Sequence, residues 1–494
     1  MSSEEYESPE GSPLGTSEGE AGDRTPVSED ALETEDAAPT TFPSTPYSMA
    51  PNIASSSTSI SAEPPLTRRL RPQKAKYYRT YDIVPLCAAI HGCQIYALDA
   101  TRNMRWVFTG GDDGYIRKYD FFGSMNGKQL LTQNQKHAQV ESVQKNEEPL
   151  PPAPVVPTPV PNTPVVVSQE NTNGITNGSI AEPSNSPQPE IVAEAPLPEP
   201  KLSAVYSLAV QSEAIWLLSG LESGGINLFT VRHEEGKCHH VLKEHNGPVS
   251  VLKITQDETG FISGSWDKQV LYWDLNNGQV VRRFIGHNSQ ITSIQFRPVL
   301  PAFSQSTRES SPESYDELFN DEDDLVNSND VLLTTSIDGH IMIWDKRAEE
   351  PIIKTLAPER TPPWSLSACW SADGTKIYCG RRNGTVDEWD VRARAVLRVL
   401  RMPNGSGPVS CVASMPNGKQ LICASTDNIR LWNLEENENS RSSVPFLIVA
   451  GHHGGTISQI LIDEQCRYMI TTSGNRGWEG STTESALFYE IGPG

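Results

Sequence analysis

The chain has 494 residues and a formal net charge of −22, a length that suits two or three ordinary domains or one large propeller with additional segments. No apolar run approaches the roughly 20 residues that a bilayer-spanning helix needs, and no apolar stretch follows Met1 as it would in a secretory signal. We therefore expect a soluble intracellular protein with no membrane partner.

Most of the acidity lies in three segments. Residues 1–66 carry thirteen acidic residues and one arginine, and residues 138–201 and 301–330 are also strongly acidic. A tail of Ser, Pro, Glu and Thr cannot bury enough apolar surface to offset its chain entropy, and a long stretch without periodicity is typical of an insertion. We expect a disordered acidic region at 1–66 and disordered inserts at 138–201 and 301–330.

Residues 67–79 form a basic flank with six basic residues and no acidic one. Such a cluster serves either as a nuclear localisation signal or as a solvated counterweight to the acidic tail. No second basic stretch accompanies it, so we do not expect direct nucleic-acid binding.

The composition offers little for catalysis or metal binding. The eight cysteines form no C-x-x-C pair, which favours small buried hydrophobes in a reducing compartment. The pairs His239-His240, beside Cys238, and His452-His453 lack the several convergent ligands that a metal needs. No P-loop motif occurs. We expect no enzyme activity, no metal and no cofactor.

From residue 80 onward the chain shows short alternating strands separated by Asn-Gly and Asp-x-x-Gly turns. The stretch 247–297 contains a four-stranded unit that carries the pair Trp273-Asp274 and restarts after roughly 40 residues, which is typical of a propeller blade. Seven such units can be counted. The sequence therefore predicts an all-β, seven-bladed β-propeller over residues 80–494, with residues 80–90 closing the last blade and 126–137 forming the outer strand of the first.

The blades carry His, Ser or Thr, Asp and Trp at recurring spacing, and this pattern resembles the WD-repeat family. The resemblance implies that each set is a structural tetrad in which Asp holds His, His contacts the hydroxyl, and the hydroxyl meets the indole N–H. Two sets are complete, and in a third Tyr replaces Trp. In sequence order within each set they are His245, Ser263, Asp267 and Trp273; His287, Thr334, Asp338 and Trp344; and His91, Thr109, Asp113 and Tyr119.

A narrower resemblance covers nearly the whole propeller. The stretches FTGGDDGYIRKYDFF (108–122), VYSLAVQSEAIWLLSGLESGGINLFTVRHEEG (205–236) and SGSWDKQVLYWDLNNG (263–278) are similar to the WD-repeat subunit of the fungal SAGA transcription co-activator. This resemblance implies a non-enzymatic scaffold in the nucleus that binds other SAGA subunits and TATA-binding protein, and that regulates the delivery of TATA-binding protein to promoters.

A second interpretation comes from Trp344-Asp-Lys-Arg347 and Trp389-Asp-Val-Arg392, which match the Trp-Asp-x-Arg box of substrate receptors for cullin-based ubiquitin ligases. The candidate partner-binding residues, for TATA-binding protein, are Trp266 and Trp478. Both are aromatic residues in hairpin sequence, where a polar residue is the default, and aromatic anchors dominate many interfaces.

Overall fold

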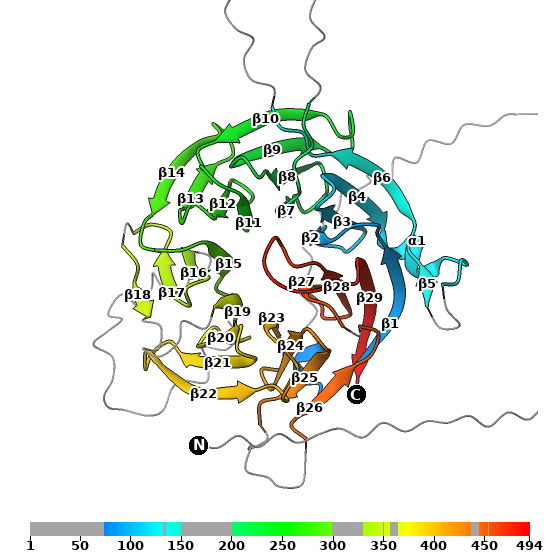
Figure 1. Cartoon of the computed structure of the whole chain (residues 1–494), viewed down its shortest axis with the longest axis vertical. Coiled ribbons are helices and arrows are strands. Elements are labelled where there is room, and N and C mark those ends of the chain that lie inside the picture. Colours follow the sequence, from blue (N-terminus) through cyan, green and yellow to red (C-terminus); the bar gives the residue numbers. More distant parts are fainter. Residues whose placement is uncertain are drawn as a thin grey trace, which may run out of the picture. The chain divides into compact units, whose positions relative to one another are not determined.

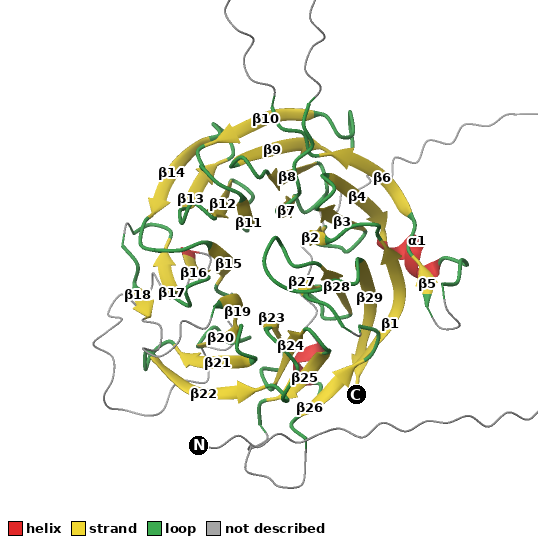
Figure 2. Cartoon of the chain, viewed as in Figure 1, coloured by secondary structure: helices red, strands yellow, loops and turns green. Residues whose placement is uncertain are grey.

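Seven β-sheets are arranged around a central axis (Figure 1), and short helices make up very little of the ordered structure (Figure 2). This computed structural model describes residues 74–131, 135–149, 200–298, 330–348, 350–355, 364–435, 444–452 and 454–494. The arrangement confirms the predicted seven-bladed β-propeller. The predicted acidic region 1–66 lies outside the described residues, as does most of both predicted inserts.

The first six blades are four-stranded antiparallel sheets whose first strand lies nearest the axis. Blade 1 has β2 (Ile95–Ala100), β3 (Trp106–Gly111), β4 (Tyr115–Asp120) and β6 (Val140–Lys145), and blade 2 has β7 (Ser207–Val210), β8 (Trp216–Gly220), β9 (Gly225–Thr230) and β10 (Cys238–Lys243). Blade 3 has β11 (Val249–Ile254), β12 (Gly260–Ser265), β13 (Val270–Asp274) and β14 (Gln279–Phe284), and blade 4 has β15 (Ile291–Phe296), β16 (Val331–Ser336), β17 (Ile341–Asp345) and β18 (Ile353–Thr355). Blade 5 has β19 (Ser365–Trp370), β20 (Lys376–Arg381), β21 (Thr385–Asp390) and β22 (Ala395–Arg401), and blade 6 has β23 (Val409–Ser414), β24 (Gln420–Ser425), β25 (Ile429–Asn433) and β26 (Phe446–Val449).

Blade 7 closes the ring with strands from both ends of the propeller. Its inner strands are β27 (Ile457–Ile462), β28 (Tyr468–Ser473) and β29 (Ser485–Pro493), and β1 (Tyr81–Ile90) pairs antiparallel with β29. The short helix η1 (Lys74–Tyr77) precedes β1 and accepts a hydrogen bond from the Tyr81 hydroxyl at Ala75 O, 2.8 Å away. The predicted closure by residues 80–90 is confirmed. Pairing of β1 removes a free sheet edge at the junction.

The predicted outer strand of blade 1 at 126–137 is wrong. After β4 the Asp120 carboxylate caps helix α1 (Phe121–Asn126) by accepting from the Gly123 N–H, 2.8 Å away. Phe121 is fully buried against Phe488 of blade 7, which draws the chain away from blade 1. The following strand β5 (Lys136–His137) pairs parallel with β1 instead.

The outer strand of blade 1 is β6, which pairs antiparallel with β4. It lies inside the segment predicted as a disordered insert, so the boundary at residue 138 is wrong. The chain stays in the propeller through Glu147, which forms a bridge with Leu202. A strand of mostly polar, exposed residues bordered by a proline-rich stretch carries no hydrophobic alternation to reveal it.

The hydrophobic core lies between neighbouring blades. The core between blades 2 and 3, for example, combines Leu218 and Ile226 with Phe261 and Trp273, all nearly inaccessible to solvent. The blades approach so closely that a Cβ on Gly220 would lie 2.5 Å from the Val249 carbonyl oxygen. Glycine is therefore required there, since any side chain would force the blades apart.

Candidate functional site: the tetrads and the upper face of the propeller

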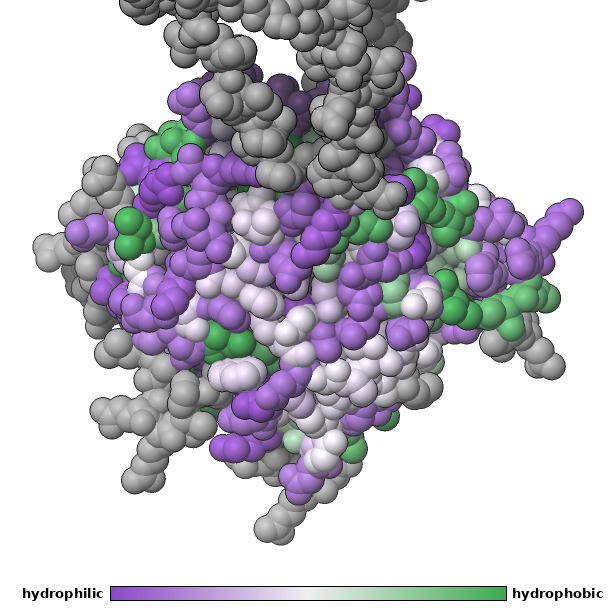
Figure 3. Space-filling model, turned by 45° about the horizontal axis from the view of Figure 1, so that its top comes forward, coloured by the Kyte–Doolittle hydropathy of each residue, from purple (hydrophilic) through white to green (hydrophobic). Residues whose placement is uncertain are grey.

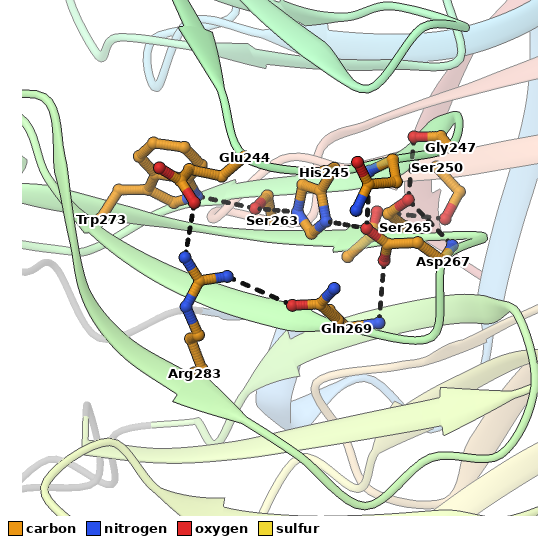
Figure 4. Close-up of polar contacts among 12 residues, drawn as sticks. Glu244, His245, Gly247, Ser250, Ser263, Ser265, Asp267, Gln269, Trp273 and Arg283 are labelled. Carbon is orange, nitrogen blue, oxygen red and sulfur yellow. Dashed lines mark hydrogen bonds and ion pairs between the residues drawn. The ribbon is translucent and has the colours of Figure 1, made fainter.

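The four predicted tetrad residues of blade 3 form one hydrogen-bonded chain (Figure 4). The Trp273 indole N–H donates to Ser263 Oγ over 2.8 Å, and Ser263 Oγ lies 2.7 Å from His245 Nε2. His245 Nδ1 lies 2.9 Å from an Asp267 carboxylate oxygen. Because the carboxylate only accepts, the His245 proton resides on Nδ1, and Nε2 accepts from the serine.

Asp267 extends this chain toward the outer strand of the blade. Burial raises the pKa of its carboxyl group, but the hydrogen bond from His245 and those from the backbone N–H groups of Asn246 and Gln269 outweigh burial and hold the pKa below its usual range. The other carboxylate oxygen accepts from the Gln269 backbone N–H at 2.9 Å, and the Gln269 side chain accepts from Arg283 at 3.3 Å. The chain thus links a core tryptophan to the blade surface.

The second tetrad contains an additional serine. His287 Nε2 lies 2.7 Å from Thr334 Oγ1, which accepts from the Trp344 indole N–H at 2.7 Å. The predicted contact between His287 and Asp338 is wrong, because Ser336 lies between them. Its hydroxyl donates to Asp338 over 2.5 Å and lies 2.9 Å from His287 Nδ1. Burial lowers the pKa of His287 to about 4, so the ring is neutral.

The third set is also only partly as predicted. The hydroxyls of Thr109 and Tyr119 each lie 3.0 Å from His91 Nε2, while His91 Nδ1 faces the Ala89 carbonyl at 3.3 Å. Asp113 does not reach the histidine and instead forms a 2.5 Å ion pair with Arg117. Burial, together with the charge of Arg117, lowers the pKa of His91 to about 4.

In blade 2 an asparagine occupies the position of the tetrad histidine. Asn146 is fully buried, and its side-chain oxygen accepts from Ser219 Oγ at 2.7 Å and from the Asn227 amide at 3.1 Å. This residue follows β6 and joins blade 1 to blade 2. Sequence reasoning missed it because it lies within the segment read as an insert.

In blades 5 and 6 an ion pair formed by a buried arginine replaces the tetrad. Arg381 pairs with Asp387 over 2.8 Å, and Arg430 pairs with Asp427 over 2.5 Å. Both arginines are almost completely buried. Burying a charge is costly unless it is paired and hydrogen-bonded, so each guanidinium depends on its carboxylate.

We call the face that carries the β12–β13 turn and the β28–β29 loop the upper face. The β28–β29 loop, residues 474–484, reaches over the centre of the ring as the red loop in Figure 1. Arg476 donates to the Ser250 carbonyl of blade 3 at 2.9 Å and to the Thr292 carbonyl of blade 4 at 3.3 Å. Glu479 forms an ion pair with Arg382 of blade 5. These contacts across the axis join residues that lie far apart in the sequence.

The loop brings the two candidate partner-binding tryptophans together. Trp266 and Trp478 are stacked, with ring centroids 6.3 Å apart and an interplanar angle of 22°. Tyr206 packs edge-on against Trp266 at 5.4 Å, and the Arg476 guanidinium lies 4.8 Å from the Trp478 ring. Both tryptophans are partly buried, and neither indole N–H has a partner among the described residues. The two tryptophans therefore form an aromatic pair on the upper face, with Tyr206 and Arg476 packed against their rings.

The weak metal candidates show no ligand cluster. Cys238, His239 and His240 are exposed on the edge strand β10, where His239 lies 3.3 Å from Thr230 Oγ1. His453 lies outside the described residues. Across the ranges that the structure describes, no three His, Cys, Asp or Glu side chains converge, and no helix is long and apolar enough to cross a membrane.

One open depression near helix α1 has a volume of about 360 Å³, and Asp120 and Arg105 contribute to its wall. The Asp120 carboxylate is already engaged in capping α1. On the face turned toward the viewer in Figure 3, hydrophobic residues occur as separate patches among hydrophilic ones.

The sequence is similar to those of known propeller proteins. A sequence profile described as the SPT8 beta propeller matches residues 81–148, 177–330 and 303–492. SAGA complex subunit Spt8 of Schizosaccharomyces pombe is 38% identical over 469 residues, which cover 85% of this chain and 81% of that protein. SAGA complex subunit SPT8 of Saccharomyces cerevisiae is 36% identical over 462 residues, covering 83% of this chain and 73% of that protein.

A more distant match shows how far similarity between propellers extends. The U5 small nuclear ribonucleoprotein 40 kDa protein of Dictyostelium discoideum is 27% identical over 286 residues, which cover 45% of this chain and 79% of that protein. The two yeast proteins, by contrast, align over most of the chain.

Proposed function

Because this chain belongs to the SPT8 β-propeller family, we propose that it is a non-enzymatic scaffold subunit of a SAGA-type transcription co-activator complex in the nucleus. Its direct partners are other SAGA subunits and TATA-binding protein. Binding regulates how much TATA-binding protein is delivered to promoters. The alignment with two SAGA subunits over more than four-fifths of the chain carries this proposal.

The side-chain contacts on the upper face support the proposed binding of TATA-binding protein. Trp266 and Trp478 are held by Tyr206, Arg476 and each other, so they lose little conformational freedom when a partner binds. Rigid aromatic side chains beside an arginine are the residue types that dominate binding energy at protein interfaces. We infer that this aromatic pair contacts TATA-binding protein.

The acidic segments support a steering role. Residues 1–66 and 301–330 together carry most of the negative charge, which would attract a basic surface on a partner. Long-range attraction raises association rates but is screened over about 8 Å at physiological ionic strength. The acidic segments therefore accelerate encounter, while the propeller provides the specific contacts.

The cullin-receptor alternative receives less support. Arg347 of the first Trp-Asp-x-Arg box is bound to Asp345 over 2.8 Å. The proteins that align over most of the chain are SAGA subunits.

A salt titration of binding to TATA-binding protein tests the proposal. Trp266→Ala and Trp478→Ala should each weaken binding by about 30-fold, which corresponds to about 2 kcal/mol. Deleting residues 1–66 should weaken binding only a few-fold, because charges at the edge of an interface mainly affect the association rate. The deletion should also make the binding affinity less dependent on salt concentration. Trp106→Ala is the matched control. Trp106 is also a partly buried tryptophan, but it begins β3 of blade 1, at the end of the blade away from the upper face.

Thermal melting of each variant must show that the propeller is intact. If the tail deletion abolishes binding while both upper-face variants bind like the wild type, the propeller is only a carrier. The assignment of the upper face would then be wrong.

A further inference from the structure

The outer strand of blade 6 differs in composition from the outer strands of the other blades. β26 reads Phe-Leu-Ile-Val, and residues 444–451 contain no charged side chain. The outer strand of each other blade contains a charged residue, and examples are Glu141 in β6, Lys243 in β10, Arg282 in β14, Lys354 in β18, Arg398 in β22 and Asp82 in β1. Charged residues on an edge strand hinder pairing with another chain. Within the described chain, blade 6 alone lacks this protection.

β26 lies at the rim of the ring, and no strand of the described chain lies beyond it (Figure 1). The direction of its backbone groups follows from its pairing with β25. The Asn433 N–H donates to the Pro445 carbonyl at 2.7 Å, and hydrogen-bonded pairs recur at every second residue of an antiparallel ladder. Leu447 is therefore the next residue bonded to β25. The N–H and C=O groups of Phe446 and Ile448 point away from the blade, where another strand can pair with them.

Two adjacent aliphatic side chains on this strand are exposed. Leu447 is 58% exposed and Ile448 is 57% exposed, and they lie on opposite faces because side chains alternate along a strand. The strand itself is fixed, since Phe446 packs against Trp432 with ring centroids 5.1 Å apart and Val449 is buried. A fixed strand loses little conformational freedom when a partner binds. The edge therefore combines unpaired backbone groups with apolar side chains.

We propose that β26 binds an extended segment of a partner protein, which adds to blade 6 as a further strand. The added strand supplies carbonyl and N–H groups to Phe446 and Ile448, and main-chain hydrogen bonds of this kind provide the affinity in strand addition. Cross-strand neighbours on the same face contact each other, so the segment carries apolar residues beside Leu447 and Ile448. The occupant is thus a β-strand whose central residues are uncharged and apolar.

The size of the edge favours a segment of a partner protein over a second copy of this chain. A stable interface between two folded proteins buries about 800 Å² on each partner. β26 has four residues, and a strand of that length spans only about 13 Å. Two propellers that met along this edge alone would therefore share too small an area for a stable dimer.

A flexible segment is not limited in this way when its own protein already contacts the propeller elsewhere. A short flexible tether gives the segment an effective concentration in the millimolar range, so even weak strand pairing is occupied. The inference goes beyond the function proposed above and uses none of the residues of the upper face. The outer edge of blade 6 is then a second protein-binding surface, separate from the aromatic pair.

Hydrogen exchange of the full-length chain, resolved to single residues by mass spectrometry, tests the proposal. The probe is a short synthetic peptide of alternating valine and threonine with a lysine at each end, added at about 1 mM to match the concentration that a tether provides. The amides of Phe446 and Ile448 should exchange about five-fold more slowly with the peptide, as a Kd of about 0.25 mM gives. The Leu447 amide is already bonded to β25, so its exchange should not change.

Two substitutions at the edge should abolish the protection of Phe446. Ile448→Pro removes an outward N–H group and breaks no hydrogen bond to β25, because proline is tolerated on an edge strand where its nitrogen faces solvent. Ile448→Lys places a charge on the same edge. Leu397→Lys is the matched control, since Leu397 is 51% exposed on β22 of blade 5, and it should leave the protection unchanged. Thermal melting must show that each variant is folded.

A matched peptide distinguishes strand pairing from other binding. The same peptide with all its amides N-methylated keeps its charge and apolar side chains but cannot donate to the edge, so it should give no protection. Equal protection by the methylated peptide, protection retained in both Ile448 variants, or no slowing in the wild type would overturn the proposal. Protection of Phe446 and Ile448 that rises with protein concentration without peptide would also overturn it, since the edge would then bind a second copy.

Discussion

Trp273→Ala removes the side chain on which the blade 3 tetrad depends. Trp273 is 1% exposed, and its ring stacks on Phe261 with centroids 5.5 Å apart and an interplanar angle of 7°. Truncating a buried tryptophan costs about 3–5 kcal/mol. The net stability of a domain is only about 5–15 kcal/mol, so the variant should be close to unfolding at mild urea concentrations.

A second substitution separates packing from hydrogen bonding. Ser263→Ala leaves the Trp273 N–H and His245 Nε2 buried without a partner, which costs about 1–3 kcal/mol for each group left unsatisfied. Trp273→Phe removes the indole donor but keeps much of the packing. Because both changes break the same contact, the double variant should be less destabilised than the sum by about 0.5–3 kcal/mol.

The assay is urea unfolding followed by far-ultraviolet circular dichroism, which does not depend on the number of tryptophans. The unfolding midpoints of the variants can be compared directly only if the free energy of unfolding falls with urea concentration at the same slope in each variant. If Trp273→Ala unfolds at the wild-type midpoint, or if the two single effects add fully, the hydrogen-bonded tetrad does not stabilise the blade and the reasoning fails.

Other predictions concern pH, closure and the central loop. Because burial lowers the folded-state pKa of His287 to about 4, this histidine stabilises the fold fully above the ordinary value of 6.5. The free energy of unfolding should fall by about 3 kcal/mol as the pH drops from 6.5 to 4, and His287→Gln should reduce that slope in pH-dependent melts. A chain beginning at Gly92 lacks β1 and should aggregate in sedimentation runs, whereas one beginning at Ser61 should remain monomeric; equal behaviour would refute the closure. Arg476→Ala should speed hydrogen exchange in residues 474–484 without unfolding the blades, and unchanged exchange would mean that its two carbonyl contacts do not hold the loop.

Local, repeated spacing explains what could be predicted from the sequence. Ser263 and Trp273 lie on paired strands ten residues apart, and Thr334 and Trp344 repeat that relation. The hairpin geometry that brings each pair together is set within one blade. The same locality made the number of blades visible as a recurring pattern, whereas closure by β1 was expected because an unpaired sheet edge is unfavourable.

The predictions that were wrong concern contacts that the local sequence pattern does not specify. The resemblance to WD repeats predicted that Asp338 contacts His287. Instead the Asp338 carboxylate accepts a hydrogen bond from Ser336, two residues away. The outer strand of blade 1 was misplaced because Phe121 packs against Phe488, a residue at the other end of the chain. Arg476 reaches Ser250 across 226 sequence positions, and no spacing rule predicts such a contact.

The most direct test of the proposed function is affinity purification of the tagged full-length chain from nuclei, with the bound proteins identified by mass spectrometry. We expect SAGA subunits to be recovered in amounts comparable to the chain, together with TATA-binding protein. We expect Trp266→Ala/Trp478→Ala to reduce the recovery of TATA-binding protein without reducing that of the SAGA subunits. Recovery of cullin adaptors in place of SAGA subunits would contradict it.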